Sequence, residues 1–172
     1  MSVFRIKAQK LTPDAFAPYG NVIEAPEDDS QTVAEDRYTF WPAVACVSCG
    51  SGALQLGISR LFSRPLRTCV MERQLGTQVM IVPMTGPILI LCAKADSLDP
   101  QETVPYRKTE AFVVRRDQGV VIDRGVWHWT PMPLGGDGDV LFCTEKKPVD
   151  NGVVKQSFPR GEALEILLSE EG

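Results

Sequence analysis

The sequence contains very little histidine: His128 is the single imidazole among 172 residues. An iron centre held by several histidines and carboxylates is therefore not expected. The chain also lacks an apolar run of about 18 residues or more, so no transmembrane helix is predicted. Arg5, Lys7 and Lys10 are not followed by an apolar stretch, which argues against a secretory signal peptide and favours a cytoplasmic protein.

Clustered positive charge is absent as well. The chain has 18 basic and 22 acidic residues, a net charge of −4, and the basic residues are spread along it. Nucleic acids and anionic membranes are bound by basic patches, so neither is expected as a partner. A small carboxylate substrate is compatible with this composition, because a few local arginines are enough to bind one. The length predicts a single domain over residues 1–172.

Cysteine is present in an odd number, which indicates reduced thiols in a cytosolic protein. Cys46 and Cys49 form a CxxC pair, but zinc would need two further ligands. A thioredoxin-like motif would open a helix, whereas residues 44–52 predict a strand followed by a turn. The favoured interpretation is two small residues at a strand end. The five cysteines are Cys46, Cys49, Cys69, Cys92 and Cys143.

The chain is rich in short runs of valine, isoleucine and aromatic residues. Glycine, proline or aspartate separates these runs, which is typical of a sandwich or jelly-roll barrel. An all-β fold is therefore predicted. The runs predicted as strands are 22–24, 37–40, 54–60, 68–72, 78–82, 88–92, 111–114, 120–123 and 140–143.

Helices are expected near the two ends of the chain. Thr12 is predicted to cap a short helix that begins at Pro13 and stops by Gly20. The leucine-rich residues 161–172 predict a C-terminal helix packed on the outside. Long connections are predicted at 24–36 and 95–108, and a hairpin-type turn at 134–139.

The single histidine lies in the segment Asp-Arg-Gly-Val-Trp-His-Trp, residues 123–129. A lone histidine is more often a packing or surface residue than a catalyst. Here Gly125 predicts a tight turn before an aromatic pair that would shield the imidazole from water. The spacing also resembles a cupin signature, Pro-x-Gly-x-x-His, with Asp123 in place of proline. In cupins this histidine points into the barrel mouth and commonly binds a metal.

A second polar group lies earlier in the chain, at Glu72, Gln74 and Gln78. Glu72 and Gln74 are two residues apart, so both face one side of a strand, and Gln78 would lie on the returning strand. We expect the three side chains to converge with His128 inside the barrel. The alternative is a polar turn whose side chains are solvated.

Several segments resemble the ureidoglycolate lyases, in the order in which that family has them. The resemblance implies a cupin-type double-stranded β-helix barrel with short flanking helices and a homodimer. It also implies cleavage of ureidoglycolate to glyoxylate and urea in allantoin (purine) breakdown. The segments are 11–24 (LTPDAFAPYGNVIE), 58–60 (ISR), 72–73 (ER) with 75–78 (LGTQ), 83–84 (PM), 111–112 (AF) with 118–120 (QGV), and 124–128 (RGVWH).

The chain departs from the family pattern at the site. That pattern has histidines where Gln74, Asp123 and Trp129 stand. Neutral amides are poor ligands for nickel or zinc, so no cofactor is expected. By family resemblance a divalent metal remains an alternative, with His128, Glu72 and Gln78 as its ligands.

Cleavage of ureidoglycolate needs a base for the hydroxyl proton and an acid for the departing nitrogen. Glu72 is the candidate base, and His128 is the candidate acid or a metal ligand. Gln78 is a candidate for orienting the substrate. The candidate substrate-binding residues are Arg60, which is expected to hold the carboxylate, Gln74, Arg124 and Trp127.

Two functions of different classes stay open. The first is a carbon–nitrogen lyase acting on ureidoglycolate or a related small 2-hydroxy acid derivative. The second is a non-catalytic cupin that binds or senses a small carboxylate. The replaced histidines favour the second function, and retention of Glu72, Gln78 and His128 favours the first.

Overall fold

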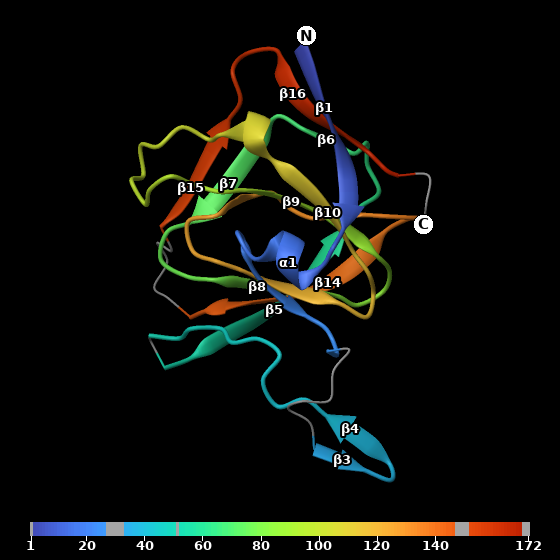
Figure 1. Cartoon of the computed structure of the whole chain (residues 1–172). Helices are drawn as coiled ribbons and strands as arrows, with labels where there is room; N and C mark the ends of the chain where they lie inside the picture. The colour runs from blue at the N-terminus through green and yellow to red at the C-terminus, as the bar shows by residue number, and fades with distance from the viewer. Residues whose placement is uncertain (1, 27–32, 51, 147–151, 170–172) are drawn as a thin grey trace.

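The computed structural model describes residues 2–26, 33–50, 52–146 and 152–169. Strands dominate it, and two curved sheets face each other to form a barrel (Figure 1). The expected all-β, cupin-type barrel is confirmed. No helix in the described part of the chain is long and apolar enough to span a membrane.

The smaller sheet has five strands in the order β2-β11-β8-β14-β5. Neighbouring strands in this sheet are antiparallel. β5 is one edge, and its eight residues pair with β14 alone. The strands are β2 (Gly20–Ile23), β5 (Leu54–Leu61), β8 (Val79–Pro83), β11 (Gly119–Ile122) and β14 (Gly138–Glu145).

The larger sheet follows the order β15-β7-β12-β9-β10-β1-β16-β6, and β13 also pairs with β9. β1 pairs in parallel with β10 and β16, so it joins the two parts of this sheet. The strands are β1 (Ser2–Lys10), β6 (Arg67–Thr68), β7 (Val70–Gln74), β9 (Ile88–Ala93), β10 (Glu110–Val114), β12 (Trp127–His128), β13 (Met132–Pro133), β15 (Val153–Ser157) and β16 (Glu162–Leu167).

The main core lies between the two sheets. Ile90 of β9 and Phe112 of β10 are buried in the same cluster as Ile81 of β8 and Ile122 of β11. A second cluster, which includes Met71 and Trp127, lies on the other face of the larger sheet. Residues of the larger sheet therefore alternate between two cores, and neighbours in sequence have different surroundings.

Two short helical segments flank the strands, in agreement with the predicted barrel with short flanking helices. α1 (Pro13–Phe16) begins after Thr12, whose Oγ1 accepts a hydrogen bond from the Ala15 nitrogen at 3.2 Å. Its Phe16 is fully buried in the main core. The second segment is a single 3-10 turn, η1 (Tyr106–Lys108), at the end of the long connection predicted over 95–108.

The predicted C-terminal helix is wrong over the described residues. Residues 162–167 form β16, which pairs in parallel with β1 and antiparallel with β6. Leucine and isoleucine fit either structure, and the partner strand β1 decides between them. Because β1 was not predicted from its polar sequence, the pairing was invisible locally. Residues 170–172 of the predicted helix lie outside the described residues.

Two smaller predictions also need correction. Residues 44–50 and 52 contain no strand, so Cys46 and Cys49 lie in an irregular segment and not at a strand end. Residues 134–139 do not close a hairpin, because β13 pairs with β9 of the larger sheet while β14 belongs to the smaller sheet. That turn carries the chain from one sheet to the other.

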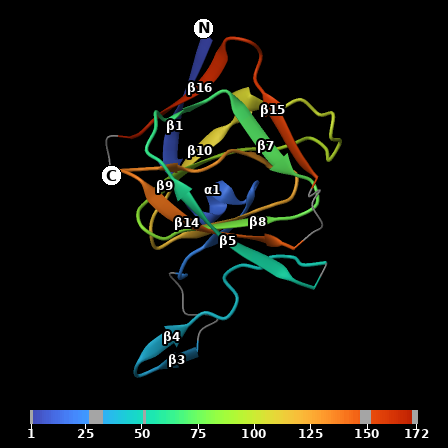
Figure 2. The same cartoon turned by 180° about the vertical axis from the view of Figure 1, so that it is seen from behind.

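A two-stranded hairpin, β3 (Val33–Glu35) and β4 (Tyr38–Phe40), extends away from the barrel in both views (Figures 1 and 2). It occupies the end of the connection predicted over 24–36, of which residues 27–32 lie outside the described part. Tyr38 and Phe40 are 51% and 54% exposed. We call residues 33–40 the arm.

Candidate active site

A row of three residues crosses three neighbouring strands of the larger sheet. Glu72 of β7 lies opposite His128 of β12 on one side and opposite Lys155 of β15 on the other. Residues directly opposite each other in a ladder project from the same face of the sheet. The row Lys155–Glu72–His128 therefore lies on the face that is turned toward the smaller sheet.

A cavity of about 240 Å³ lies between the two sheets at this row. Its polar groups come mainly from β7 and β12, and its apolar walls come mainly from the smaller sheet. Glu72 and His128 thus meet in one cavity although they are far apart in the sequence. The lining residues are Ser59, Leu61, Glu72, Gln74, Val79, Ile81, His128, Trp129, Thr130, Pro131, Val140 and Phe142.

His128 is held as one tautomer. Its Nδ1 lies 2.9 Å from the carbonyl oxygen of Val126, and a carbonyl only accepts, so Nδ1 carries the proton and donates. Burial lowers the pKa of His128 from its ordinary value of 6.5, against smaller opposing effects of this hydrogen bond and of Glu72. The imidazole is therefore neutral at pH 7, and Nε2 is free to accept a proton.

Gln74 has an unsatisfied acceptor at the cavity. The residue is 9% exposed, and within the described part of the chain its buried Oε1 has no hydrogen-bond partner. An unpaired buried acceptor costs about 1–3 kcal/mol, which a ligand with an N–H donor would recover. The backbone carbonyl oxygen of Gln74 accepts a hydrogen bond from the Gly125 nitrogen at 2.7 Å. This bond connects β7 to the turn before His128. Gly125 has φ 82°, which suits only glycine comfortably.

Gln78 lies apart from this cavity. Its Nε2 donates to Asp123 Oδ1 at 2.7 Å, and its Oε1 accepts from the Ser48 nitrogen at 2.8 Å. Both ends of the amide are engaged, and Gln78 does not line the cavity. Of the three side chains expected to converge with His128, the structure brings Glu72 and Gln74 to it and leaves Gln78 outside.

Three predicted substrate-binding residues also lie away from the cavity. Arg60 forms two hydrogen bonds with Asp139, at 2.9 and 3.0 Å, and its side chain is 70% exposed. Arg124 is exposed and is not among the lining residues. Trp127 is fully buried in the second core, on the opposite face of the larger sheet from His128. The carboxylate-binding group expected at Arg60 must therefore come from elsewhere.

Lys155 lies beside Glu72 in this row and was not singled out from the sequence. Its ammonium nitrogen lies 4.7 Å from the ring centroid of Trp129, which lines the cavity. Its local sequence, VVKQS over residues 153–157, does not distinguish it from any other polar residue of a strand. The pairing of β15 with β7, which places Lys155 beside Glu72, is a contact between distant segments and leaves no mark in the sequence.

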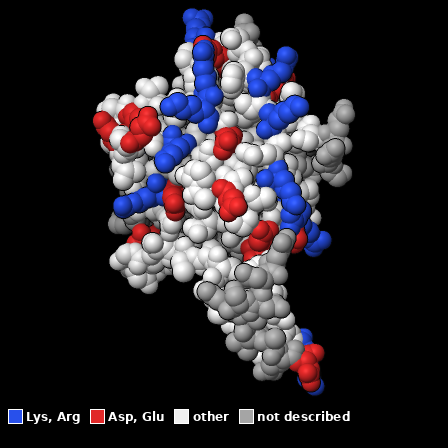
Figure 3. Space-filling view, in the orientation of Figure 1, with Lys and Arg blue, Asp and Glu red and all other residues white. Residues whose placement is uncertain are grey.

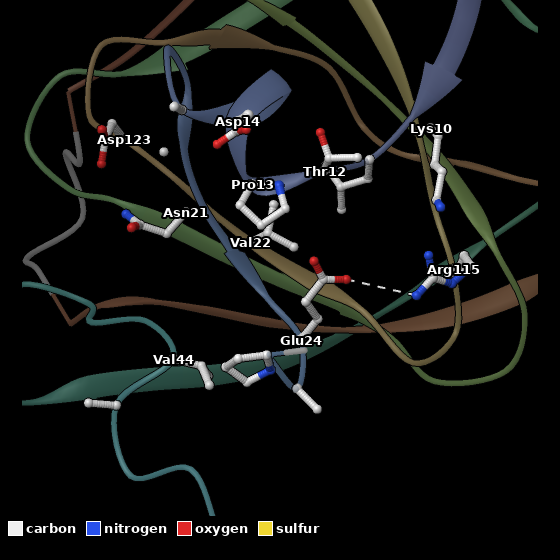
Figure 4. Close-up of a pocket in the computed structure, with 16 residues that line it drawn as sticks. Lys10, Thr12, Pro13, Asp14, Asn21, Val22, Glu24, Val44, Arg115 and Asp123 are labelled. Carbon is white, nitrogen blue, oxygen red and sulfur yellow. Dashed lines mark ion pairs between the residues drawn. The ribbon is translucent and has the colours of Figure 1, made fainter. Parts of the chain in front are cut away.

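A larger groove of about 1110 Å³ lies on the outside of the barrel, along α1 and β2 (Figure 4). Some of its charged groups pair with each other: Arg115 forms an ion pair with Glu24 at 3.8 Å. Asp123 lies at the other end of the labelled residues in the close-up. Neither Glu72 nor His128 lines this groove. Size alone favours the groove, but the histidine and the unsatisfied amide favour the inner cavity.

The donor set of the inner cavity does not suit a transition metal. Among the described residues there is no group of three or more histidine, cysteine, aspartate or glutamate side chains that could hold a metal ion. The cavity offers one imidazole, one carboxylate and the neutral amide of Gln74, and neutral amides bind nickel or zinc weakly. No chemical step is therefore derived through a metal.

The fold and the cavity define the class of the protein: a cupin-type barrel with one histidine and one carboxylate side by side in its interior. A family model described as "Ureidoglycolate lyase" matches residues 3–163. The chain belongs to the ureidoglycolate lyase family.

Two curated relatives agree with this membership, and a solved structure has a similar arrangement. The chain is 31% identical over 171 residues to a "Ureidoglycolate lyase" of Chelativorans sp. (strain BNC1), covering 96% of this chain and 98% of the relative. It is 30% identical over 154 residues to one from Agrobacterium fabrum, covering 85% and 87%. A solved dTDP sugar isomerase from Desulfovibrio desulfuricans is similar with a TM-score of 0.47 and 13% identity, covering 84% of this chain and 87% of that one.

Proposed function

We propose that this enzyme cleaves ureidoglycolate to glyoxylate and urea. The observation that carries the proposal is the pair Glu72 and neutral His128 in one cavity, in a chain of the ureidoglycolate lyase family. The alternative, a cupin that only binds or senses a carboxylate, is not favoured by these findings. The reaction belongs, in our proposal, to purine breakdown through allantoin in the cytoplasm.

The reaction is a proton transfer coupled to one bond cleavage. The hydroxyl on the central carbon loses its proton, and the C–O bond becomes the carbonyl of glyoxylate. The C–N bond to the ureido group breaks, and its electron pair goes to nitrogen, which takes up a proton to give urea. No oxidant or water is consumed, so a single group that accepts and returns one proton is sufficient.

His128 is suited to be that group. Because Nδ1 donates to Val126, Nε2 is the free acceptor, and the lowered pKa keeps it unprotonated. His128 then takes the hydroxyl proton first and returns it to the departing nitrogen. This assignment reverses the expected order, in which Glu72 was the base and His128 the acid. The buried tautomer, which the sequence does not reveal, is the physical reason.

Glu72 stabilises the charge that His128 acquires. Its carboxylate faces the same cavity from the directly opposed position of the neighbouring strand. A negative charge beside an imidazole favours the protonated form, and Glu72 has this effect on the pKa of His128. Glu72 therefore lowers the barrier to the first proton transfer without itself exchanging a proton.

Gln74 is suited to bind the ureido group. Its unpaired Oε1 accepts an N–H, and urea-like groups carry several. Val79, Ile81 and Phe142 supply apolar walls around the remaining space. In such a site, hydrogen bonds and charges act in a low dielectric and are stronger than in water.

We further propose that the enzyme is a homodimer. Leu54, Leu56 and Ile58 of edge strand β5 are 47%, 65% and 58% exposed. They alternate along the strand, so they share the outer face of the smaller sheet. A row of exposed apolar residues on an unpaired edge is a surface for association.

The arm gives a second reason to expect a partner copy. An isolated two-stranded hairpin is marginally stable in water, and this one exposes Tyr38 and Phe40. The arm extends away from the barrel, so it does not cover β5 of its own chain (Figures 1 and 2). A twofold arrangement would let the arm of each copy cover the apolar face of the other.

Nucleic acid is not proposed as a partner. In the space-filling view, acidic and basic side chains are interspersed over the visible face of the barrel (Figure 3). Several are paired with each other, including Arg60 with Asp139 and Arg107 with Glu162. The visible face therefore shows no continuous positive patch of the kind that binds phosphates.

The direct test is turnover. Purified protein is incubated with ureidoglycolate, and glyoxylate and urea are quantified separately. Equal amounts of both products, formed faster than in the buffer control, support the proposal. Tight binding of ureidoglycolate without product formation would instead establish the non-catalytic alternative.

A further inference from the structure

We propose that Lys155 is the residue that binds the carboxylate of the substrate. The proposal rests on the proposed function, because the substrate is taken to be a small 2-hydroxy acid derivative. It assigns a role to a residue in the strand β15, at the edge of the larger sheet.

Among the described residues, those that line the cavity include no lysine and no arginine. They do include Glu72, whose carboxylate would repel a second carboxylate at close range. A substrate anion therefore needs a cation close to Glu72 to offset this repulsion. Ser59 and Thr130 offer neutral hydroxyls, which bind an anion more weakly than a charged donor does.

The arginines near the cavity already contact other groups of the protein. Arg64 donates from Nη2 to the carbonyl oxygens of Thr130 and Pro131, at 2.9 and 3.0 Å, and so supports the cavity wall from behind. Arg73 is fully buried on the other face of the larger sheet, where it stacks on Trp127 at 4.6 Å. Arg60 is paired with Asp139 outside the barrel.

Lys155 has the required position. It lies directly opposite Glu72 on the inner face, and Glu72 lies directly opposite His128. Adjacent strands are about 4.8 Å apart, so the Lys155 and His128 backbones are separated by about 10 Å, within the combined reach of their side chains. The Lys155 ammonium lies 4.7 Å from the ring centroid of Trp129, so the lysine side chain reaches one of the residues that line the cavity.

The surroundings leave the ammonium available for a ligand. A cation over an aromatic face is attracted to the ring but forms no hydrogen bond with it, so the N–H donors remain open. Lys155 itself is exposed, which lets an incoming anion reach it from solvent. The carboxylate would be bound at the Lys155 end of the row, with the neighbouring carbon over Glu72 and within reach of His128.

The kinetic test compares three variants with the wild-type enzyme. Lys155→Met keeps the aliphatic stem and removes the charge, and it is expected to raise KM for ureidoglycolate about 10- to 100-fold with a smaller change in kcat. Lys155→Arg is expected to recover most of this loss. Arg60→Met is the matched control, an exposed arginine outside the cavity, and is expected to leave KM unchanged. An unchanged KM in Lys155→Met, or a raised KM in Arg60→Met alone, would overturn the proposal.

A binding experiment separates this proposal from the proposed function. Calorimetric titration compares glycolate with glycolamide, its neutral amide, on the wild type and on Lys155→Met. The expected result is a wild-type preference for glycolate that Lys155→Met loses. If the wild type does not turn over ureidoglycolate but shows this Lys155-dependent preference, the lyase proposal fails and the carboxylate site stands. Equal preference in both proteins overturns the carboxylate site, whether or not turnover is observed.

Discussion

Glu72 and Arg73 are neighbours in sequence but lie on opposite faces of β7. Glu72 faces the cavity with His128. Arg73 is fully buried in the second core, stacks on Trp127, and donates to the carbonyl oxygens of Ser97 and Asp99. One strand thus separates the chemistry from a charged group that organises the fold.

The two faces differ in what surrounds their polar groups. On the Arg73 face, Glu102 also accepts from the Asp96 and Ser97 nitrogens and lies 3.4 Å from Arg73. On the cavity face, Gln74 Oε1 is left without a partner in the described structure. Arg73 Nε and Trp127 Nε1 also lack partners among the described residues, but Trp127 lies in a packed core, whereas Gln74 lines a cavity that a ligand can enter.

The largest expected effect is on the cavity face. Replacement of His128 by glutamine removes the proton acceptor while keeping a neutral side chain of similar reach. We expect kcat to fall about 1,000-fold, in the range attributed to general acid–base groups. The measurement is steady-state glyoxylate release, with thermal unfolding as the control for folding. A loss of less than tenfold in a folded variant would remove His128 from the mechanism.

On the other face of β7, we expect Arg73→Met to lower stability and to leave catalysis unchanged. We expect the free energy of unfolding to fall by about 3 kcal/mol, because the carbonyls of Ser97 and Asp99 lose their donor. The protein that remains folded should keep its KM, since Arg73 does not line the cavity. Urea denaturation and kinetics on the same sample check both halves. A fully stable variant with a large kinetic defect would show that the two faces have been assigned the wrong way round.

Much of the barrel could be predicted from the sequence, because alternation and punctuating glycines are local signals. Nine strand segments and the cap at Thr12 were found in this way. The strands β1, β3, β12, β13, β15 and β16 were missed. Among these, β1, β15 and β16 each depend on a partner distant in sequence. At the site, Glu72, Gln74 and His128 were identified from motif spacing. The position of Lys155 beside Glu72 and the outward direction of Arg60 depend on the register of strand pairing, which cannot be read from the sequence.

Dimer formation should depend on the outer face of β5 and not on the cavity face. Ile58→Lys places a charge in the exposed apolar row and is expected to raise the dimer dissociation constant about 100-fold. Ser59→Ala, the next residue but on the inner face, is the matched control and should not change assembly. Light scattering over a dilution series measures both. A wild type that is monomeric at micromolar concentration would contradict the assembly proposal.

A smaller effect concerns acid stability. The folded-state pKa of His128 is lowered by burial, so as pH falls below about 6.5 the unfolded chain takes up this proton before the folded one does. The free energy of unfolding should therefore decline by up to about 1.4 kcal/mol per pH unit until the folded pKa is reached. His128→Gln should lack this component. Chemical denaturation at pH 7 and pH 5 compares the two proteins, and identical pH dependence would show that His128 is not held neutral.

The most direct test of the account is metal-free turnover. Wild-type protein and His128→Gln are treated with a chelator, their metal content is measured by elemental analysis, and glyoxylate release from ureidoglycolate is followed from pH 5 to pH 8. The account predicts that the wild type, with far less than one metal per chain, remains active with an acid limb below about pH 6.5, and that the variant loses both activity and limb. Activity that is lost on chelation and restored by nickel, zinc or manganese would contradict it, and would make His128 a metal ligand.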